Sequence, residues 1–394
     1  MNNQSKSDEE KIIRKRMAIR DLEEDKHRKR RYAFLKAFHV IKNLPPENED
    51  SYWKIASFNG QPFTHPRTTP PESLKMWGAD SQHQNVLFLP WYRAYLLHLE
   101  EALVRNAPED GDLVALHYWD ETWKEIIKKG EPPLPNLLVK EFVEIDDDGT
   151  TISNPLLGFT LPKAIPLSQA TSKYVKPAGY TTCRYPYSGL RKPENPLQET
   201  FNAKIQNDYV NHNLPKSPTF YLQENITHAL KHSIHKSYKD CLEVEKYNKF
   251  SNIQSGNHSV ELASIQMLQA LGGTGEFSLI AGSHGDLGSN EMAAFDPLFF
   301  LHMSNVDRVF WLWYEKWAHN VDMGMSKPDK GEQPKYGQGP SPNQTGNEVL
   351  TADTNLYPFK KAGKYLNRNE LMDIKELGYH YERGSMTLPD PPHD

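Results

Sequence analysis

The sequence predicts a mainly α-helical protein with long loops and few short strands. Three observations support this class. Apolar residues recur at helical spacing in several segments, helix-start and helix-stop residues flank these segments, and residues 130–220 are rich in Pro, Asn, Ser and Thr with little periodicity. Loops of that length usually border a functional surface.

The first predicted helix covers residues 8–42. It is densely charged at its start, becomes apolar over residues 32–38 and ends before Pro45 and Pro46. We therefore expect one long helix that is exposed first and buried later. The basic run at residues 27–31 is interpreted as a solvated helix face rather than a nucleic-acid-binding patch.

The second predicted helix opens at Pro90, a residue favoured in the first helical turn. Its apolar stripe consists of Tyr92, Leu96, Leu99 and Leu103. Tyr92 is therefore expected to face the interior. His98 lies off this stripe, and we interpret it, like His117, as a structural residue.

Two further helices are predicted in the second half of the chain. One runs from Ser259 to Leu271 and is stopped by Gly272-Gly273. The other opens at Asp296-Pro297 and reaches residue 313, with an apolar stripe made of Phe299, Met303, Val306, Phe310 and Trp313. These stripes indicate a shared core.

Composition bounds the possible partners. The 394 residues carry a formal charge of −5, which gives no whole-chain attraction for nucleic acid. The polar N-terminus and the absence of a long apolar run predict a cytoplasmic protein without a membrane span. Cys183 and Cys241 are expected to be free thiols. A small molecule is the favoured partner, and the oligomeric state stays open.

Three motifs resemble the signatures of one known family. Residues 83–96 begin with His83 and continue through Asn85-Val86-Leu87-Phe88 and Pro90-Trp91-Tyr92-Arg93. Residues 294–308 contain Asp296-Pro297 and His302-Met303, and residues 378–381 read Gly-Tyr-His-Tyr. Together they resemble the type-3 copper family of tyrosinases, catechol oxidases and hemocyanins, and most nearly its short fungal-type members. The resemblance implies a four-helix bundle core.

The resemblance also implies a domain organisation. It covers residues 31–385, which we expect to form one tyrosinase-like domain. Residues 1–30 are then a charged, helical N-terminal extension, and residues 386–394 are a tail.

In that family six histidines hold two copper ions. By the resemblance, the first-copper positions are His83, Tyr92, nine residues further on, and Lys75 upstream. The second-copper positions are Ser264 and Leu268, counted back from Gly272-Gly273, and Met303. His302 replaces Met303 in this set if the first residue of the family's His-His pair is the ligand. We therefore expect His83, with or without His302, to be what remains of the ligand set.

This reading makes a copper pair unexpected and predicts either no cofactor or a single non-copper metal such as zinc. A zinc site needs about three protein ligands. Beyond His83 they would have to come from nearby polar residues, which we interpret mainly as loop residues: His65, His258, His284, Asp286 and Glu291.

The residues at these positions predict a pocket for a small aromatic molecule. The predicted catalytic residues are Lys75, His83, Tyr92 and Glu261, and the predicted pocket residues are Asn290, Ser264, Leu268, His302, Met303 and Phe299. Apolar walls would shift the pKa values of such titratable groups toward neutrality.

The favoured function is a non-redox enzyme, a lyase or one that rearranges a small aromatic metabolite. Two alternatives remain at this point. The first is a catalytically silent scaffold or binding protein. The second is a copper o-diphenol oxidase, if the ligand positions are assigned differently.

Overall fold

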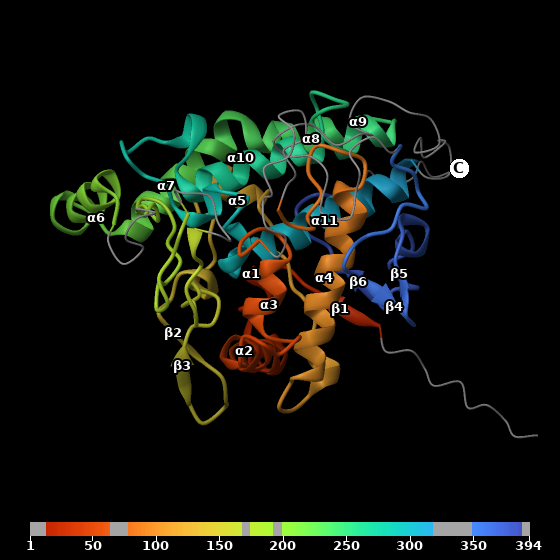
Figure 1. Ribbon diagram of the computed structural model, residues 1–394, viewed down its shortest axis with the longest axis horizontal. Coiled ribbons are helices and arrows are strands. Elements are labelled where there is room, and N and C mark those ends of the chain that lie inside the picture. The colour runs from red at the N-terminus through yellow and green to blue at the C-terminus, as the bar shows by residue number, and fades with distance from the viewer. Residues whose placement is uncertain (1–12, 64–77, 168–173, 192–198, 318–348, 388–394) are drawn as a thin grey trace, which may run out of the picture.

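The computed structural model describes residues 13–63, 78–167, 174–191, 199–317 and 349–387. Helices predominate (Figure 1), which confirms the predicted class. The helices are α1 (Ile19–Leu22), α2 (Arg28–Asn43), α3 (Tyr52–Ser57), α4 (Phe88–Arg105), α5 (Lys124–Lys129), α6 (Phe201–Asn213), α7 (Pro218–Ala229), α8 (His235–Leu242), α9 (Tyr247–Ser251), α10 (Val260–Gly272) and α11 (Leu298–Trp317).

The strands are few and short, as the sequence predicts. They are β1 (Arg14–Arg16), β2 (Phe142–Glu144), β3 (Thr151–Ser153), β4 (Lys360–Lys361), β5 (Lys364–Tyr365) and β6 (Tyr379–Tyr381). Within the described ranges they form three two-stranded sheets, of which β1–β6 is parallel and the other two are antiparallel.

The N-terminal segment differs from its prediction. One continuous helix over residues 8–42 is wrong for the described part, because Arg14–Arg16 form β1 beside β6 and the long helix starts only at Arg28. Pairing with β6 buries Arg16 completely against Glu100, with which it forms an ion pair of 3.0 Å. Residues 14–16 therefore pack into the body of the protein and do not form a helical extension.

The other three predicted helices are confirmed as α4, α10 and α11. α10 is capped at its N-terminus by Ser259, whose hydroxyl accepts a hydrogen bond from Leu262 N at 3.3 Å. At its C-terminus it is capped by Gly273, whose φ of +65° favours glycine. α4 packs against α2 and α11, and α11 packs against α10. This arrangement agrees with the predicted four-helix core.

Helices α6 and α7 were missed. The sequence predicts loops to residue 220, but α6 begins at a Thr200 cap and α7 at a Ser217 cap followed by Pro218. The large apolar side chains of α6 lie on its exposed face, with Phe201 70% and Ile205 51% exposed. Figure 1 shows α6 at the left edge, away from α4. The buried side of α6 carries only Ala203, Gln206 and Val210, so it lacks the stripe of large apolar residues that marks a core helix.

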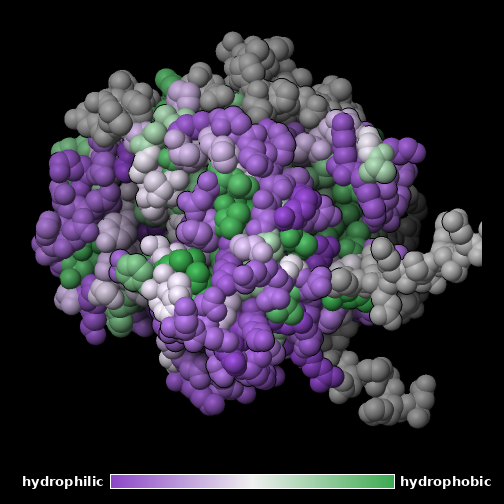
Figure 2. Space-filling model, turned by 90° about the horizontal axis from the view of Figure 1, so that it is seen from below, coloured by the Kyte–Doolittle hydropathy of each residue, from purple (hydrophilic) through white to green (hydrophobic). Residues whose placement is uncertain are grey.

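The surface in Figure 2 is mainly hydrophilic, and its apolar residues form small separate groups. In the described part of the chain, every helix is too short or too polar to cross a membrane.

Candidate functional site

His83 lies in the turn that leads into α4. The preceding backbone is shaped by Asn85, whose side-chain oxygen accepts from Leu87 N at 2.8 Å and whose amide donates to His83 O at 3.2 Å. Gln84 adopts a left-handed φ of 56°, which turns the chain toward α10. The His83 ring is 8% exposed, and its Nε2 lies 3.2 Å from the hydroxyl of Tyr92 on α4.

Asn59 joins this pair, although the sequence did not single it out. The Tyr92 hydroxyl donates to Asn59 Oδ1 at 2.6 Å, and Asn59 Nδ2 donates to Asn290 O at 2.9 Å. Gly60 permits this approach, because a Cβ there would lie 2.4 Å from Glu291 O. Asn59 is a loop residue of a type common in turns, so no local signal marks it.

Glu261 approaches His83 from the first turn of α10. Its carboxylate is fully buried and accepts from Gln84 N at 2.8 Å and from Ile253 N at 3.0 Å. Its Oε1 lies 3.9 Å from His83 Nδ1. Two segments far apart in sequence therefore bring His83 and Tyr92 together with Glu261.

Burial sets the protonation of this cluster. It raises the pKa of Glu261 to about 7, against the opposing effect of the Gln84 and Ile253 N–H groups, and lowers the pKa of His83 to about 4. Burial also raises the pKa of Tyr92 well above its ordinary value. At neutral pH His83 is therefore uncharged, so its contact with Glu261 is not a salt bridge.

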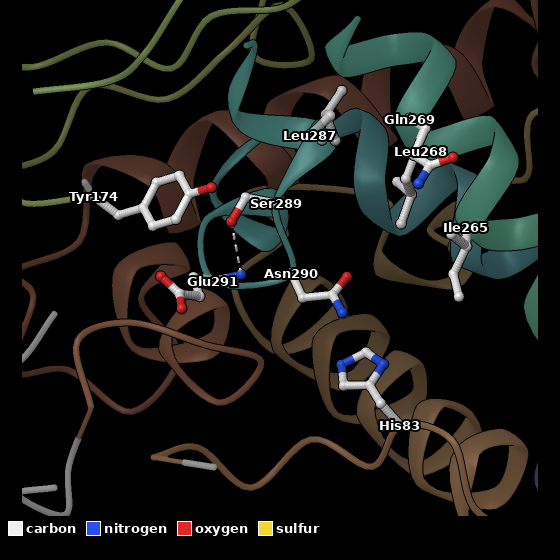
Figure 3. Close-up of a pocket in the computed structure, with 10 residues that line it drawn as sticks. His83, Tyr174, Ile265, Leu268, Gln269, Leu287, Ser289, Asn290 and Glu291 are labelled. Carbon is white, nitrogen blue, oxygen red and sulfur yellow. Dashed lines mark hydrogen bonds between the residues drawn. The ribbon is translucent and has the colours of Figure 1, made fainter. Parts of the chain in front are cut away.

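A cavity of about 330 Å³ opens beside His83 (Figure 3). In Figure 3 the His83 ring points toward the Asn290 side chain, while Leu268 and Gln269 face the space from α10. The lining residues are His83, Tyr174, Ile265, Leu268, Gln269, Leu287, Gly288, Ser289, Asn290 and Glu291. Of the predicted pocket residues, His83, Leu268 and Asn290 line it. Tyr174 and Gln269 were not predicted.

Other predicted pocket residues are buried without lining this cavity. Tyr92, Ser264, Phe299, Met303 and His302 are each 2% exposed or less. The Phe299 ring contacts the Tyr92 ring in a tilted arrangement, with centroids 6.1 Å apart and 60° between the ring planes. Lys75 lies outside the described residues, so its predicted catalytic role stays a prediction.

His302 is engaged at both ring nitrogens. Nδ1 lies 2.5 Å from Glu121 Oε1, and Nε2 lies 2.8 Å from the Ser264 hydroxyl. Both ring nitrogens therefore have hydrogen-bond partners within the protein.

The additional metal-ligand candidates are dispersed or already bonded. Asp286 pairs with Lys176 at 3.0 Å, His258 with Asp240 at 3.4 Å, and Glu291 accepts from Gln61 at 2.9 Å. His284 Nε2 lies 3.2 Å from the Tyr174 hydroxyl. His65 is outside the described residues. Among the described residues, no three His, Cys, Asp or Glu side chains are grouped as a metal site would require.

Comparison with known proteins places this arrangement in a family. The tyrosinase family profile, described as the common central domain of tyrosinase, matches residues 49–316. The chain belongs to the tyrosinase family. This confirms the resemblance drawn from the motifs.

Two tyrosinase relatives align over nearly the whole chain. Tyrosinase HcTyr2 of Hahella sp. is 33% identical over 95% of this chain and 74% of its own length, and a tyrosinase of Aspergillus oryzae is 30% identical over 93% and 72%. A solved tyrosinase from Burkholderia thailandensis superposes with a TM-score of 0.82 and 30% identity, covering 96% of this chain and 76% of that one.

A further solved structure bears on the cofactor. It is an active tyrosinase of Aspergillus oryzae described as copper-bound and complexed with L-tyrosine, with a TM-score of 0.66 and 18% identity over 95% of this chain and 93% of that one. The expectation of no cofactor, or of a single non-copper metal such as zinc, is contradicted, because the tyrosinase family points to copper.

The described residues of this tyrosinase-family chain nevertheless do not fit a copper pair. Imidazole nitrogens are the ligands that such a site uses. His83 is the cavity's histidine, its neighbours Asn59 and Tyr92 offer an amide and a phenol, and His302 is committed to Glu121 and Ser264. No chemical step through copper follows from these residues, and any chemistry beside the cavity falls to the chain's own side chains.

Proposed function

We propose that the protein binds a small hydroxylated aromatic compound beside His83 and catalyses a non-oxidative proton transfer on it, leading to elimination or rearrangement. The observation that carries this proposal is the buried contact of His83 with Glu261, next to a cavity of about 330 Å³. That volume is at the small end of ligand sites and suits a compound of about one ring.

The lining supports an aromatic ligand with polar substituents. Tyr174, Leu268 and Leu287 offer apolar contacts, and the amides of Asn290 and Gln269 can bond hydroxyl groups. The ligand class also agrees with the L-tyrosine bound to the Aspergillus oryzae tyrosinase.

In this proposal His83 is the catalytic base. It is uncharged at neutral pH because burial lowers its pKa to about 4. A proton accepted at Nδ1 would lie near Glu261 Oε1, 3.9 Å away, whose negative charge stabilises the resulting imidazolium. Glu261 does not line the cavity, and Tyr92 holds the opposite ring nitrogen, so both are positioning residues.

A second candidate is oxidation of a phenol. The names of the tyrosinase relatives favour it, and it requires copper bound in a way that the described residues do not provide.

The domain organisation, with one domain over residues 31–385 between a charged N-terminal segment and a tail, also remains a proposal.

The proton transfer can be measured directly with L-tyrosine and catechol as probes in D₂O. The base takes the hydroxyl proton, which in D₂O is a deuteron, and delivers it to a ring carbon. Loss of hydrogen from that carbon then leaves deuterium on the ring, which NMR detects. We expect the protein to accelerate exchange, His83→Ala to slow it by about 100-fold or more and Tyr92→Phe by about tenfold. His258→Ala, a histidine 60% exposed at its side chain, is the matched control and should keep the full rate.

The alternatives give different results in the same samples. Dioxygen uptake with catechol, without faster deuterium exchange, would support the oxidase and reject the proposal. If neither activity appears and thermal shift finds no binding of either probe, the silent scaffold is the better description.

The pH dependence of stability provides a separate prediction. The pKa of Glu261 in the folded protein is raised to about 7. Its contribution to the free energy of unfolding is therefore fully present below the pKa of the unfolded state and is lost as pH rises through 7. Between pH 4.5 and 7 the wild type should lose about 3 kcal/mol more than Glu261→Gln. His83, whose pKa is lowered from 6.5 to about 4, gives the opposite slope over nearly the same pH range in both proteins, so only the difference between the two proteins reports Glu261.

Urea unfolding of both proteins at several pH values measures this difference. Parallel curves would show that Glu261 titrates normally. In the exchange assay, the wild-type rate should rise through about pH 7 as Glu261 ionises, and Glu261→Gln should abolish that rise.

A further inference from the structure

A second buried cluster lies on the inner side of α10. The Ser264 hydroxyl is 2.8 Å from His302 Nε2, and His302 Nδ1 is 2.5 Å from Glu121 Oε1. The Tyr238 hydroxyl donates to the other carboxylate oxygen of Glu121 at 2.7 Å. These residues come from α10, α11, the segment before α5, and α8. All four side chains are at least 98% buried.

The hydrogen-bond partners determine which group donates and which accepts in this series of contacts. Tyr238 donates to Glu121, and a carboxylate oxygen accepts likewise from an imidazole N–H, which assigns the His302 proton to Nδ1 and leaves a lone pair at Nε2. The Ser264 hydroxyl then donates to His302 Nε2 at 2.8 Å, and the Met303 sulfur, 3.7 Å away, is its other acceptor. Serine, imidazole and carboxylate in this order and at these distances form the arrangement that activates a serine nucleophile.

Ser264 also lies close to the cavity. Leu268, one helical turn further along α10, and Ile265 both line the cavity. Glu261, one turn before Ser264, contacts the lining residue His83. Ser264 therefore lies on α10 between Glu261 and the lining residue Leu268, and its own side chain is buried and does not line the cavity.

We infer that Ser264, His302 and Glu121 form a nucleophilic relay that transfers an acyl group from a small ester entering through the cavity. Ser264 Oγ bonds to the carbonyl carbon while its proton moves to His302 Nε2. The ester C–O bond then breaks, and that proton leaves with the alcohol. Water attacks the acyl group on Ser264, giving the acid and restoring the hydroxyl, so ester and water become acid and alcohol.

This inference is independent of the proton transfer at His83 and uses different side chains. It also gives Ser264 a chemical role of its own. A purely structural role would instead use the same hydrogen bonds to hold α10 against α11, and would not make Ser264 reactive.

Diisopropyl fluorophosphate tests the relay without knowledge of the natural ester. Attack by Ser264 forms the Oγ–P bond and releases fluoride. We expect intact-mass analysis of the full chain to show one adduct and peptide mapping to place it on Ser264. Ser264→Ala should remove the adduct. Ser237→Ala should leave it unchanged, because the Ser237 hydroxyl donates to Gln266 Oε1 at 2.8 Å.

Further variants distinguish activation from folding. Glu121→Gln and His302→Gln should slow labelling by about 100-fold or more at unchanged circular dichroism, because the relay loses its base or the group that orients it. Leu268→Ala should speed labelling by widening access. Hydrolysis of p-nitrophenyl acetate should follow the same order. The inference is overturned if folded wild type and folded Leu268→Ala both remain unlabelled, or if the adduct lies on another residue.

Discussion

Replacing Asp307 by alanine is expected to lower the free energy of unfolding by about 3–5 kcal/mol, because it leaves the buried Arg93 without its carboxylate and leaves Arg16 with Glu100 alone. Asp307 is 3% exposed on α11. Its Oδ1 accepts from Arg93 Nε at 2.6 Å, and its Oδ2 lies 3.4 Å from Arg16 Nη1. The hydroxyls of Tyr379 and Tyr381 donate to Oδ2 at 2.8 and 2.7 Å.

This centre joins α4, α11, β1 and β6, so its loss should affect the whole fold. Chemical denaturation of wild type and Asp307→Ala measures the difference. The control is Asp208→Ala, which removes a solvent-exposed partner of Lys204 on α6 and should not change stability measurably. If Asp307→Ala lowers the free energy of unfolding as little as the control does, the arginines must find other partners in the variant.

Asp307 also predicts sensitivity to acid. Burial opposes its ionisation, but Arg93 and Arg16 hold the pKa below its ordinary value. A carboxyl with a lowered folded pKa contributes stability above its unfolded pKa and loses it as pH falls through the folded pKa. We therefore expect Asp307→Asn to be destabilised at neutral pH and to depend less on pH below about 4 than the wild type.

Asp296→Ala should have a comparable effect at the start of α11. Asp296 is fully buried and binds Arg184 through two oxygens, at 2.7 Å to Nε and 2.8 Å to Nη2. Its Oδ1 also accepts from Leu298 N at 2.9 Å. Removing the carboxylate costs about 3–5 kcal/mol for the buried arginine and about 1 kcal/mol for the lost cap.

Thermal and urea unfolding of Asp296→Ala test this expectation. Asp296→Asn is the informative companion, because it keeps an oxygen for Leu298 N while losing the charge opposite Arg184, so it should be intermediate. Glu243→Ala, which removes the 73% exposed partner of Lys316, serves as the surface control. Equal stability of wild type and Asp296→Ala would show that the Arg184 contact is not a net stabilising interaction.

Helix prediction succeeded where periodicity reflected burial. α4, α10 and α11 carry apolar stripes that pack on one another, so their sequences record their surroundings. It failed at the N-terminus, where the choice between helix and strand for Arg14–Arg16 depends on β6, more than 360 residues away. It also failed at α6, where the apolar side chains are exposed.

Site prediction was limited in a different way. His83, Tyr92 and Glu261 were predicted together, and they do meet. Asn59 and Glu121 were not predicted, because an amide in a loop and a carboxylate beside other acidic residues have no local pattern. Ser264 and His302 were predicted as pocket residues, but their hydrogen bond spans 38 positions and only packing of α10 on α11 creates it.

The sequence by itself determined the family, the helical class and three of the core helices, since spacing along a helix already decides which side chains share a face. The tertiary structure decided which of these groups touch. Hydrogen bonds and pKa shifts depend on distances of a few ångströms between segments remote in sequence, and on burial that no single segment produces alone. For this reason Glu261 acquires its raised pKa, and Ser264 its histidine, only in the folded chain.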